Sequence, residues 1–293
     1  MEDLSTIHDP NRYYGLIRAR VEDFLSDVEG KFYLSEVYDY AGAHDDNAKS
    51  AVRMSIQKLK KDRIIKSSDG RAGCYKKVEN DLRIIDLTSI KDVASLDVAL
   101  PLGFGHFVEI YAKDLIVYAG TPNQGKTSFM LEALRLNMNR FQCFYFSSEM
   151  SAVACRNRIL KHRDTLLKEW KINFIESFVD VVDVIQPDAV NFVDYVEAPD
   201  GEFFRIPSIL SQIQRKLLKG VAFVALQKNP GTSYGIGGYQ TLAKPSIFFT
   251  LEYNVCKVEK AKNFKKINPN GFSAKFRIVD GINLSRFGDW TAP

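Results

Sequence analysis

One segment limits what this chain can fold into more than any other feature of the sequence. Residues 120–127, GTPNQGKT, match the pattern GxxxxGK[ST] at every fixed position. The apolar run DLIVYAG leads into the first glycine, and TSFMLEALRLNMN, which favours a helix, continues from the last threonine. A strand that enters such a loop and a helix that leaves it form the context in which this pattern binds phosphate. The alternative is an ordinary glycine-rich turn.

The spacing within this segment has a physical basis. Gly120 and Gly125 let the backbone turn so that successive N–H groups face phosphate oxygens. We expect Lys126 to reach the β- and γ-phosphates and the Thr127 hydroxyl to be a ligand of Mg²⁺. The residues expected to contact the nucleotide, taken as ATP with Mg²⁺, are Gly120, Thr121, Pro122, Asn123, Gln124, Gly125, Lys126, Thr127 and Ser128.

Residues 81–293 carry repeated short apolar runs, and helical stretches separate the earlier ones. These runs cover 115–120, 143–148, 189–194, 221–226 and 246–252. Runs of this length between crossovers are typical of buried parallel strands. Residues 255–261 and 272–279 flank the turn sequence NPNG and indicate antiparallel strands that close the sheet. We therefore predict an α/β domain over 81–293 with a mostly parallel central sheet.

Residues 1–80 follow a different pattern, and we predict a separate small domain there. A short apolar piece at 31–34 precedes a helix that Ser35 is expected to cap and Gly42 to end. Before this piece, an amphipathic helix fits about 11–28, with apolar residues at helical spacing that are Tyr14, Ile17, Val21, Phe24 and Leu25.

A third helix and a hairpin complete this N-terminal part. The hairpin fits 64–79 around an Asp-Gly turn. The helix fits 47–62, and the candidates for its buried side are Ala51, Met54, Ile56 and Leu59. Helix, short strand, helix, helix and hairpin in this order resemble a winged helix-turn-helix domain. In that fold the third helix usually enters the major groove of DNA.

Charge is divided unevenly within this part. Residues 1–46 hold 4 basic and 11 acidic side chains, a net of −7, whereas residues 47–77 hold 10 basic and 2 acidic, a net of +8. Such a basic cluster would neutralise phosphates and make DNA binding depend on salt. The candidate DNA contacts are Lys49, Arg53, Lys58, Lys60, Lys61, Lys66, Arg71, Lys76 and Lys77. The alternative is a protein-docking module or a solvated helix face.

Composition narrows the class further. The net charge of the whole chain is only +4, too small to indicate nucleic acid by itself. The cysteines form no CxxC pair, so neither a zinc site nor a disulfide framework is indicated. The acidic, polar N-terminus is unlike a signal peptide, and no uncharged apolar run reaches the ~18 residues of a membrane span. We expect a soluble cytoplasmic protein without a membrane partner, located in the host cytoplasm if a phage encodes it.

Five segments stand in the same order as the motifs of a known family. They are DLIVYAGTPNQGKTSFMLEAL, FYFSSEM, PDAVNFVDYVE, VAFVALQKN and VEKAKNF. Through them, about residues 88–293 resemble the RecA-like ATPase core of DnaB-type replicative helicases and, more loosely, the KaiC-like ATPases. The resemblance implies a RecA-like P-loop NTPase fold and a homo-oligomeric ring or filament that hydrolyses ATP at its subunit boundaries.

The resemblance also implies roles for two carboxylates. Glu149 would activate the attacking water, with Glu197 as the runner-up, and Asp194 would join Thr127 beside the metal. A carboxylate at the carboxyl end of a buried strand lies next to the phosphate loop in sheets of this kind, which fits Asp194. The alternatives are a strand-end aspartate that caps a turn and a glutamate that stabilises a helix N-terminus.

Three further residues take roles from the resemblance. Gln227 would sense the γ-phosphate, and Lys260 and Lys262 would reach the nucleotide of a neighbouring subunit. The family has arginine where this chain has Lys262, and lysine lacks the planar fork of an arginine finger. Gln227 would otherwise satisfy local backbone groups, and the lysines would be solvated on an edge strand.

The regions expected to contact DNA also differ from the family. The loops that would thread single-stranded DNA map to about 199–204 and 229–238, where Tyr234 could stack on a base. The second loop could equally be a plain connector. The family usually carries a helical N-terminal domain, whereas this chain carries the winged-helix-like part.

These features together predict a DNA-associated ATPase that drives helicase or translocase activity in DNA replication or recombination, on single- or double-stranded DNA. Two alternatives remain open. One is an ATP-dependent DNA-binding regulator or loader with little turnover. The other is a signalling ATPase of the KaiC type.

Overall fold

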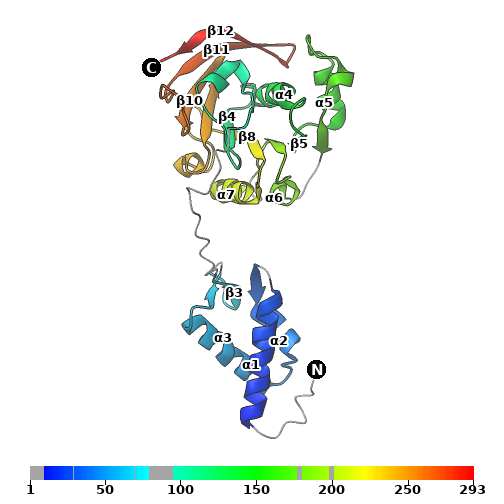
Figure 1. Cartoon of the computed structure of the whole chain (residues 1–293), viewed down its shortest axis with the longest axis vertical. Helices are drawn as coiled ribbons and strands as arrows, with labels where there is room; N and C mark the ends of the chain where they lie inside the picture. The colour runs from blue at the N-terminus through cyan, green and yellow to red at the C-terminus, as the bar shows by residue number, and fades with distance from the viewer. Residues whose placement is uncertain (1–9, 29, 69, 79–94, 177–179, 198–200) are drawn as a thin grey trace. The chain divides into compact units, whose positions relative to one another are not determined.

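The chain divides into two compact units, Met1–Lys91 and Asp92–Pro293 (Figure 1). The computed structural model describes residues 10–28, 30–68, 70–78, 95–176, 180–197 and 201–293. The domain boundary expected between residues 80 and 81 lies outside the described residues.

The described part of the N-terminal unit packs three helices beside a small antiparallel sheet. Its elements are α1 (Pro10–Asp27), β1 (Lys31–Tyr33), α2 (Leu34–Ala41), α3 (Asp46–Lys61), β2 (Ile65–Ser67) and β3 (Cys74–Lys77). The strand order is β1-β3-β2, and both pairs are antiparallel. All three helices contribute to the core, for example through Ile17, Val37 and Val52. Each helix is amphipathic, and its apolar face is buried in this core.

One helix boundary in this unit differs from the sequence expectation. α2 begins at Leu34 with Tyr33 as its N-cap, so the prediction of Ser35 as the cap is wrong. The reason is local: the Glu36 carboxylate accepts a hydrogen bond from the Tyr33 backbone N–H at 2.5 Å and anchors the helix start. The end at Gly42 is confirmed, because this residue is the C-cap with φ 67° in the left-handed region.

The C-terminal unit is built on a 9-stranded sheet with the order β12-β11-β10-β9-β4-β8-β7-β5-β6. Strands β6, β5, β7, β8, β4 and β9 run parallel, and β10, β11 and β12 continue the sheet antiparallel. The strands are β4 (Leu115–Gly120), β5 (Cys143–Ser147), β6 (Asn173–Glu176), β7 (Val190–Asp194), β8 (Val221–Gln227), β9 (Ile247–Glu252), β10 (Val255–Ala261), β11 (Ser273–Val279) and β12 (Asn283–Thr291). The predicted α/β class with a mostly parallel sheet is confirmed.

Helices cover both faces of this sheet (Figure 1). They are α4 (Lys126–Asn137), α5 (Ala152–Ile159), α6 (Val181–Val184) and α7 (Ile206–Lys216), with the 3-10 turns η3 (Pro101–His106), η4 (Leu167–Glu169), η6 (Phe203–Arg205) and η7 (Tyr239–Leu242). Alternate strand residues enter different cores, as the pleat requires: Tyr118 packs with α4 residues such as Phe129, and Val117 packs with α7 residues such as Leu210.

The strands predicted from apolar runs all occur, within one or two residues of the expected ends. Two edge strands, β6 and β12, were not expected. Both lie at the ends of the strand order and carry mixed polar and apolar residues, so no apolar run marks them. Within the described residues, no helix combines the length and the apolar character that a membrane crossing needs.

Candidate functional site

The segment 120–127 joins the carboxyl end of β4 to α4, and β4 is an interior strand of the sheet. Lys126 is the first residue of α4, and Gly125 before it has φ 94°. Asn123 also has a positive φ, of 63°. The Lys126 ammonium turns back on the loop and donates hydrogen bonds to the carbonyl oxygens of Gly120 and Thr121, both at 3.1 Å. The backbone of the loop therefore holds the Lys126 ammonium.

A side chain has no room at Gly125 and little room at Gly120. A Cβ at Gly125 would lie 2.3 Å from Ile278 Cδ1, and its backbone conformation disfavours any L side chain. A Cβ at Gly120 would lie 3.3 Å from atoms of β9. The turn between β11 and β12 also meets the loop, because the Ser128 hydroxyl donates to the Gly281 carbonyl at 2.9 Å.

Asp194 ends β7 and is only 2% exposed. The Tyr145 hydroxyl donates to its Oδ2 at 2.6 Å. Its Oδ1 is buried and has no hydrogen-bond partner among the described residues. Burial raises the pKa of Asp194, while the Tyr145 hydrogen bond, the Thr127 hydroxyl and the Lys126 charge oppose that rise. A buried carboxylate oxygen without a partner is costly, so the site favours a cation or donor beside it.

Lys126 is buried as well, with 8% exposure. Burial lowers the pKa of its ammonium, and the charges of Glu149 and Asp194 raise it again. Keeping the Lys126 ammonium and the Asp194 carboxylate away from water costs free energy. A ligand that carries both anionic oxygens and a cation would offset that cost.

A cavity of about 370 Å³ opens over the loop. Its lining includes the expected Pro122, Asn123, Gly125, Lys126, Thr127, Ser128, Glu149 and Gln227. These residues come from the ends of β4, β5 and β8 and from the start of α4, which sheet topology brings to one edge. Gln227 ends β8, which is next to β4, whereas Glu149 follows β5, which β7 and β8 separate from β4.

Three residues line the same cavity without having been expected from the sequence. They are Arg158 of α5, Ile278 of β11 and Gly281 in the turn after it. Their spacing in the sequence does not indicate a role in the site, because only the packing of the strands and helices brings them to the loop. The only available signal for Arg158 was a basic residue on the helix that follows Glu149.

Several expected site residues do not line this cavity; they are Gly120, Thr121, Gln124, Asp194, Lys260, Lys262 and Tyr234. The Lys260 ammonium donates to the carbonyl oxygens of Leu242 and Ala243, and burial lowers its pKa to about 8, with a further lowering from Lys262. Tyr234 is half-buried and edge-on to Tyr239. Of the expected DNA-threading loops, 229–238 is described, whereas residues 199 and 200 of the first lie outside the described residues.

The expected DNA contacts of the N-terminal unit lie on α3 and on the hairpin. Arg53, Lys58, Lys60 and Lys61 are exposed on α3, and Lys49 is half-buried at its start. Arg71 is exposed in the hairpin turn, whereas Lys66 and Lys76 face each other in the β2–β3 register, so those positions stand side by side. Lys77 instead donates to the Ser26 carbonyl at 3.3 Å. Among the described residues, α3 thus carries five of the expected contacts, four of them exposed.

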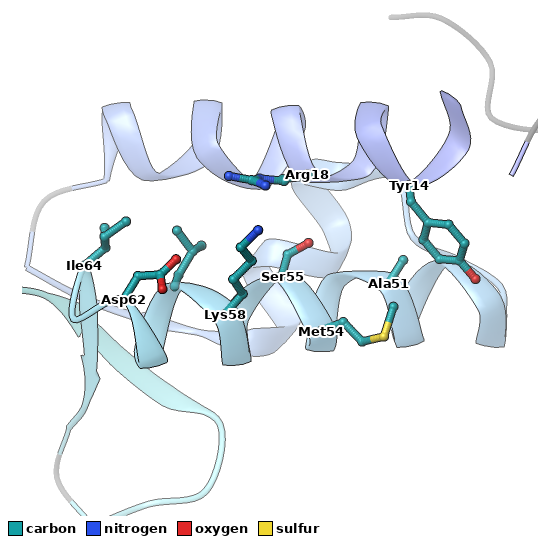
Figure 2. A pocket seen from close by; sticks show the side chains of 9 residues that line it. Tyr14, Arg18, Ala51, Met54, Ser55, Lys58, Asp62 and Ile64 are labelled. Atoms are coloured by element: carbon teal, nitrogen blue, oxygen red, sulfur yellow. The ribbon is translucent and has the colours of Figure 1, made fainter. Parts of the chain in front are cut away.

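A groove of about 210 Å³ runs between α1 and α3. Figure 2 shows Tyr14 and Arg18 of α1 and Met54 and Lys58 of α3 around it. Met54 is 55% exposed, so its expected burial is wrong, and Tyr14 is 45% exposed. Their apolar surface remains outside because the inner face of α3 is already filled by smaller and branched residues such as Val52. The groove is mixed in character, with apolar walls and basic rims.

Comparison with known proteins does not assign this chain to a family. No protein-family model and no curated protein matches this chain. Among the described residues, no group of three or more His, Cys, Asp or Glu side chains is placed to hold a metal ion.

Proposed function

We propose that the C-terminal unit is a RecA-like P-loop ATPase that binds ATP with Mg²⁺. The observation that carries the proposal is that Lys126 and Asp194 are both buried and influence each other through their charges, at a loop where Gly125 leaves no room for a side chain. A triphosphate with its metal meets each of these needs at once. Phosphate oxygens would take the loop amides and the lysine, and the metal would face the carboxylate side.

The residues that would hold this ligand have separate tasks. Lys126 would bind the β- and γ-phosphate oxygens after it leaves the carbonyls of Gly120 and Thr121. Thr127 and Asp194 would hold Mg²⁺, which supplies charge neutralisation to the phosphates when bound. The site fits a metal of this kind, because Mg²⁺ usually takes one or two protein carboxylates or hydroxyls and keeps its other positions for phosphate and water.

Hydrolysis would depend on the opposite wall of the cavity. Glu149 would accept a proton from the attacking water and orient it in line with the γ-phosphate. Gln227 would hydrogen-bond the same water or a γ-phosphate oxygen. Glu149 and Gln227 line the cavity, whereas Glu197, the other candidate base, does not, although Glu149 and Glu197 are both exposed. This difference favours Glu149.

We extend the proposal to DNA. The order of elements in the N-terminal unit and the basic surface of α3 support a winged-helix domain that binds the DNA backbone. The chain would then be a DNA-associated ATPase of the DnaB type, acting as a helicase or translocase in a ring or filament of its own copies.

The test of this function is the rate of phosphate release from ATP, measured with and without single-stranded DNA. The proposal predicts release that requires magnesium and that single-stranded DNA accelerates. Release that is unaffected by DNA, together with no DNA binding, would favour the signalling ATPase instead.

The basic surface of α3 leads to a separate prediction. Lys60→Gln/Lys61→Gln should make the dependence of DNA affinity on salt less steep, lowering the log–log slope by about 2, because each lost phosphate contact removes about one released counterion. The measurement is a fluorescence anisotropy titration of duplex DNA over a range of salt concentrations. The matched control is Lys168→Gln/Lys219→Gln, which removes the same charge from exposed positions of the other unit. Equal slopes for both variants would contradict DNA binding by α3.

One observation favours a second candidate, a DNA-binding regulator or loader with little turnover. Lys260, expected to reach a neighbouring subunit, is held by the carbonyls of Leu242 and Ala243 within its own chain. Lys262 alone would then act across a subunit boundary, and it lacks the fork of an arginine. Tight binding of ATP with negligible phosphate release, in the presence and absence of DNA, would identify this candidate.

A further inference from the structure

A guanidinium that no assigned role uses lies in the wall of the cavity. Arg158 is half-buried on α5 and lines the cavity together with Lys126, Glu149 and Gln227. Within the described residues it makes no hydrogen bond or ion pair through its side chain. A partly buried arginine normally satisfies its five donors, so an unpaired one is the feature that needs explanation.

Neighbouring arginines show that this is not a general property of the region. Arg135 forms a double contact with Glu132, at 2.7 and 2.8 Å. Arg163 pairs with Asp280 at 3.2 Å. Each of these arginines neutralises a carboxylate of the same chain, whereas Arg158 keeps its donors for something that enters the cavity.

The charge of Arg158 reaches two buried side chains of the same unit. One is Asp194, whose carboxylate attracts the guanidinium. The other is Cys155, because burial raises its pKa to about 11 and the same guanidinium opposes that rise. Arg158 thus adds positive potential where Lys126 already provides it, so the cavity favours a ligand with more negative charge than one phosphate carries.

The position of Arg158 selects one part of such a ligand. The loop amides before Lys126 and the N-terminus of α4 lie on the β4 side, where a β-phosphate would be held. Arg158 lies on α5, which follows β5 and Glu149, and β5 is separated from β4 by β7 and β8. A terminal phosphate that projects from the loop toward β5 would therefore approach Arg158.

We propose that Arg158 binds the terminal phosphate of a nucleoside triphosphate held by the same chain, and that it makes the site prefer triphosphate to diphosphate. The inference rests on the proposed function, because it assigns a residue to the same nucleotide. The planar fork of arginine matches two phosphate oxygens at once. Arg158 would thus provide, within the same chain, the guanidinium that Lys260 and Lys262 lack.

The experiment compares the affinities for Mg–ADP and for a nonhydrolysable ATP analogue by calorimetry on the full chain. Arg158→Gln should weaken binding of the analogue about 10- to 100-fold, the range for a charge-assisted hydrogen bond, and leave ADP affinity within about 3-fold. The matched control is Arg156→Gln, an exposed arginine on the same helix that does not line the cavity. It should change neither affinity.

Three results would overturn the assignment, and each has its own meaning. An unchanged ratio of the two affinities in Arg158→Gln excludes contact with the terminal phosphate. An equal loss for both nucleotides places Arg158 on another part of the ligand. Failure of the unaltered protein to bind either nucleotide removes the proposed function itself. If Arg158→Gln does not fold, Arg158→Lys provides the test: it keeps the charge but loses the fork, so it should still reduce the preference for triphosphate.

Discussion

Replacement of Lys126 by alanine is expected to lower the rate of ATP hydrolysis at least ~100-fold, since loss of a preorganised charge at the phosphates typically has an effect of this size. Lys126 is the one ammonium group among the residues that line the cavity, and the loop carbonyls of Gly120 and Thr121 already direct it there. The measurement is phosphate release at saturating ATP, with and without single-stranded DNA.

Stability separates this loss from misfolding. Burial lowers the pKa of Lys126, which means that the folded protein without ligand disfavours the ammonium that the unfolded chain prefers. Lys126→Ala should therefore unfold at the same temperature as the unaltered protein or a higher one. Lys168→Ala, at an exposed position away from the cavity, is the activity control. Equal hydrolysis by Lys126→Ala and the unaltered protein would refute the catalytic assignment.

Glu149→Gln should lower the hydrolysis rate about 100- to 10,000-fold while nucleotide affinity stays nearly constant. The amide has almost the same shape but cannot accept the proton of the attacking water, and no contact to the phosphates is lost. Single-turnover hydrolysis and calorimetric titration on the same variant measure the two quantities.

The runner-up base provides the control for this prediction. Glu197→Gln removes an exposed carboxylate that follows β7 but does not line the cavity, so its rate should stay close to that of the unaltered protein. The reverse result, with Glu197→Gln inactive and Glu149→Gln active, would move the general base from the end of β5 to the end of β7.

The parts of the fold that sequence predicted well are those decided by local chemistry. β4, β5, β7, β8 and β9 are buried on both faces, so each appears as an apolar run. The expected loop between a strand and a helix occurs at 120–127, and its backbone explains the glycine at 125, which has a positive φ and where a Cβ would collide with Ile278.

The parts that sequence missed are decided by long-range packing. Arg158 and Ile278 reach the cavity only through the order of strands and helices, which no local pattern encodes. β12 is an edge strand with mostly exposed residues, so periodicity does not mark it. The spacing of apolar residues predicted the helix around Met54 correctly. It could not show that other residues already fill the inner face of α3 and that Met54 lies outside.

The central claim is that the loop at 120–127 holds a polyphosphate between backbone amides and Lys126. Isothermal titration of the full chain with a nonhydrolysable ATP analogue in magnesium buffer tests it most directly. The account predicts saturable binding of about one analogue per chain that weakens strongly in Lys126→Ala. No detectable binding by the unaltered, folded protein would contradict it.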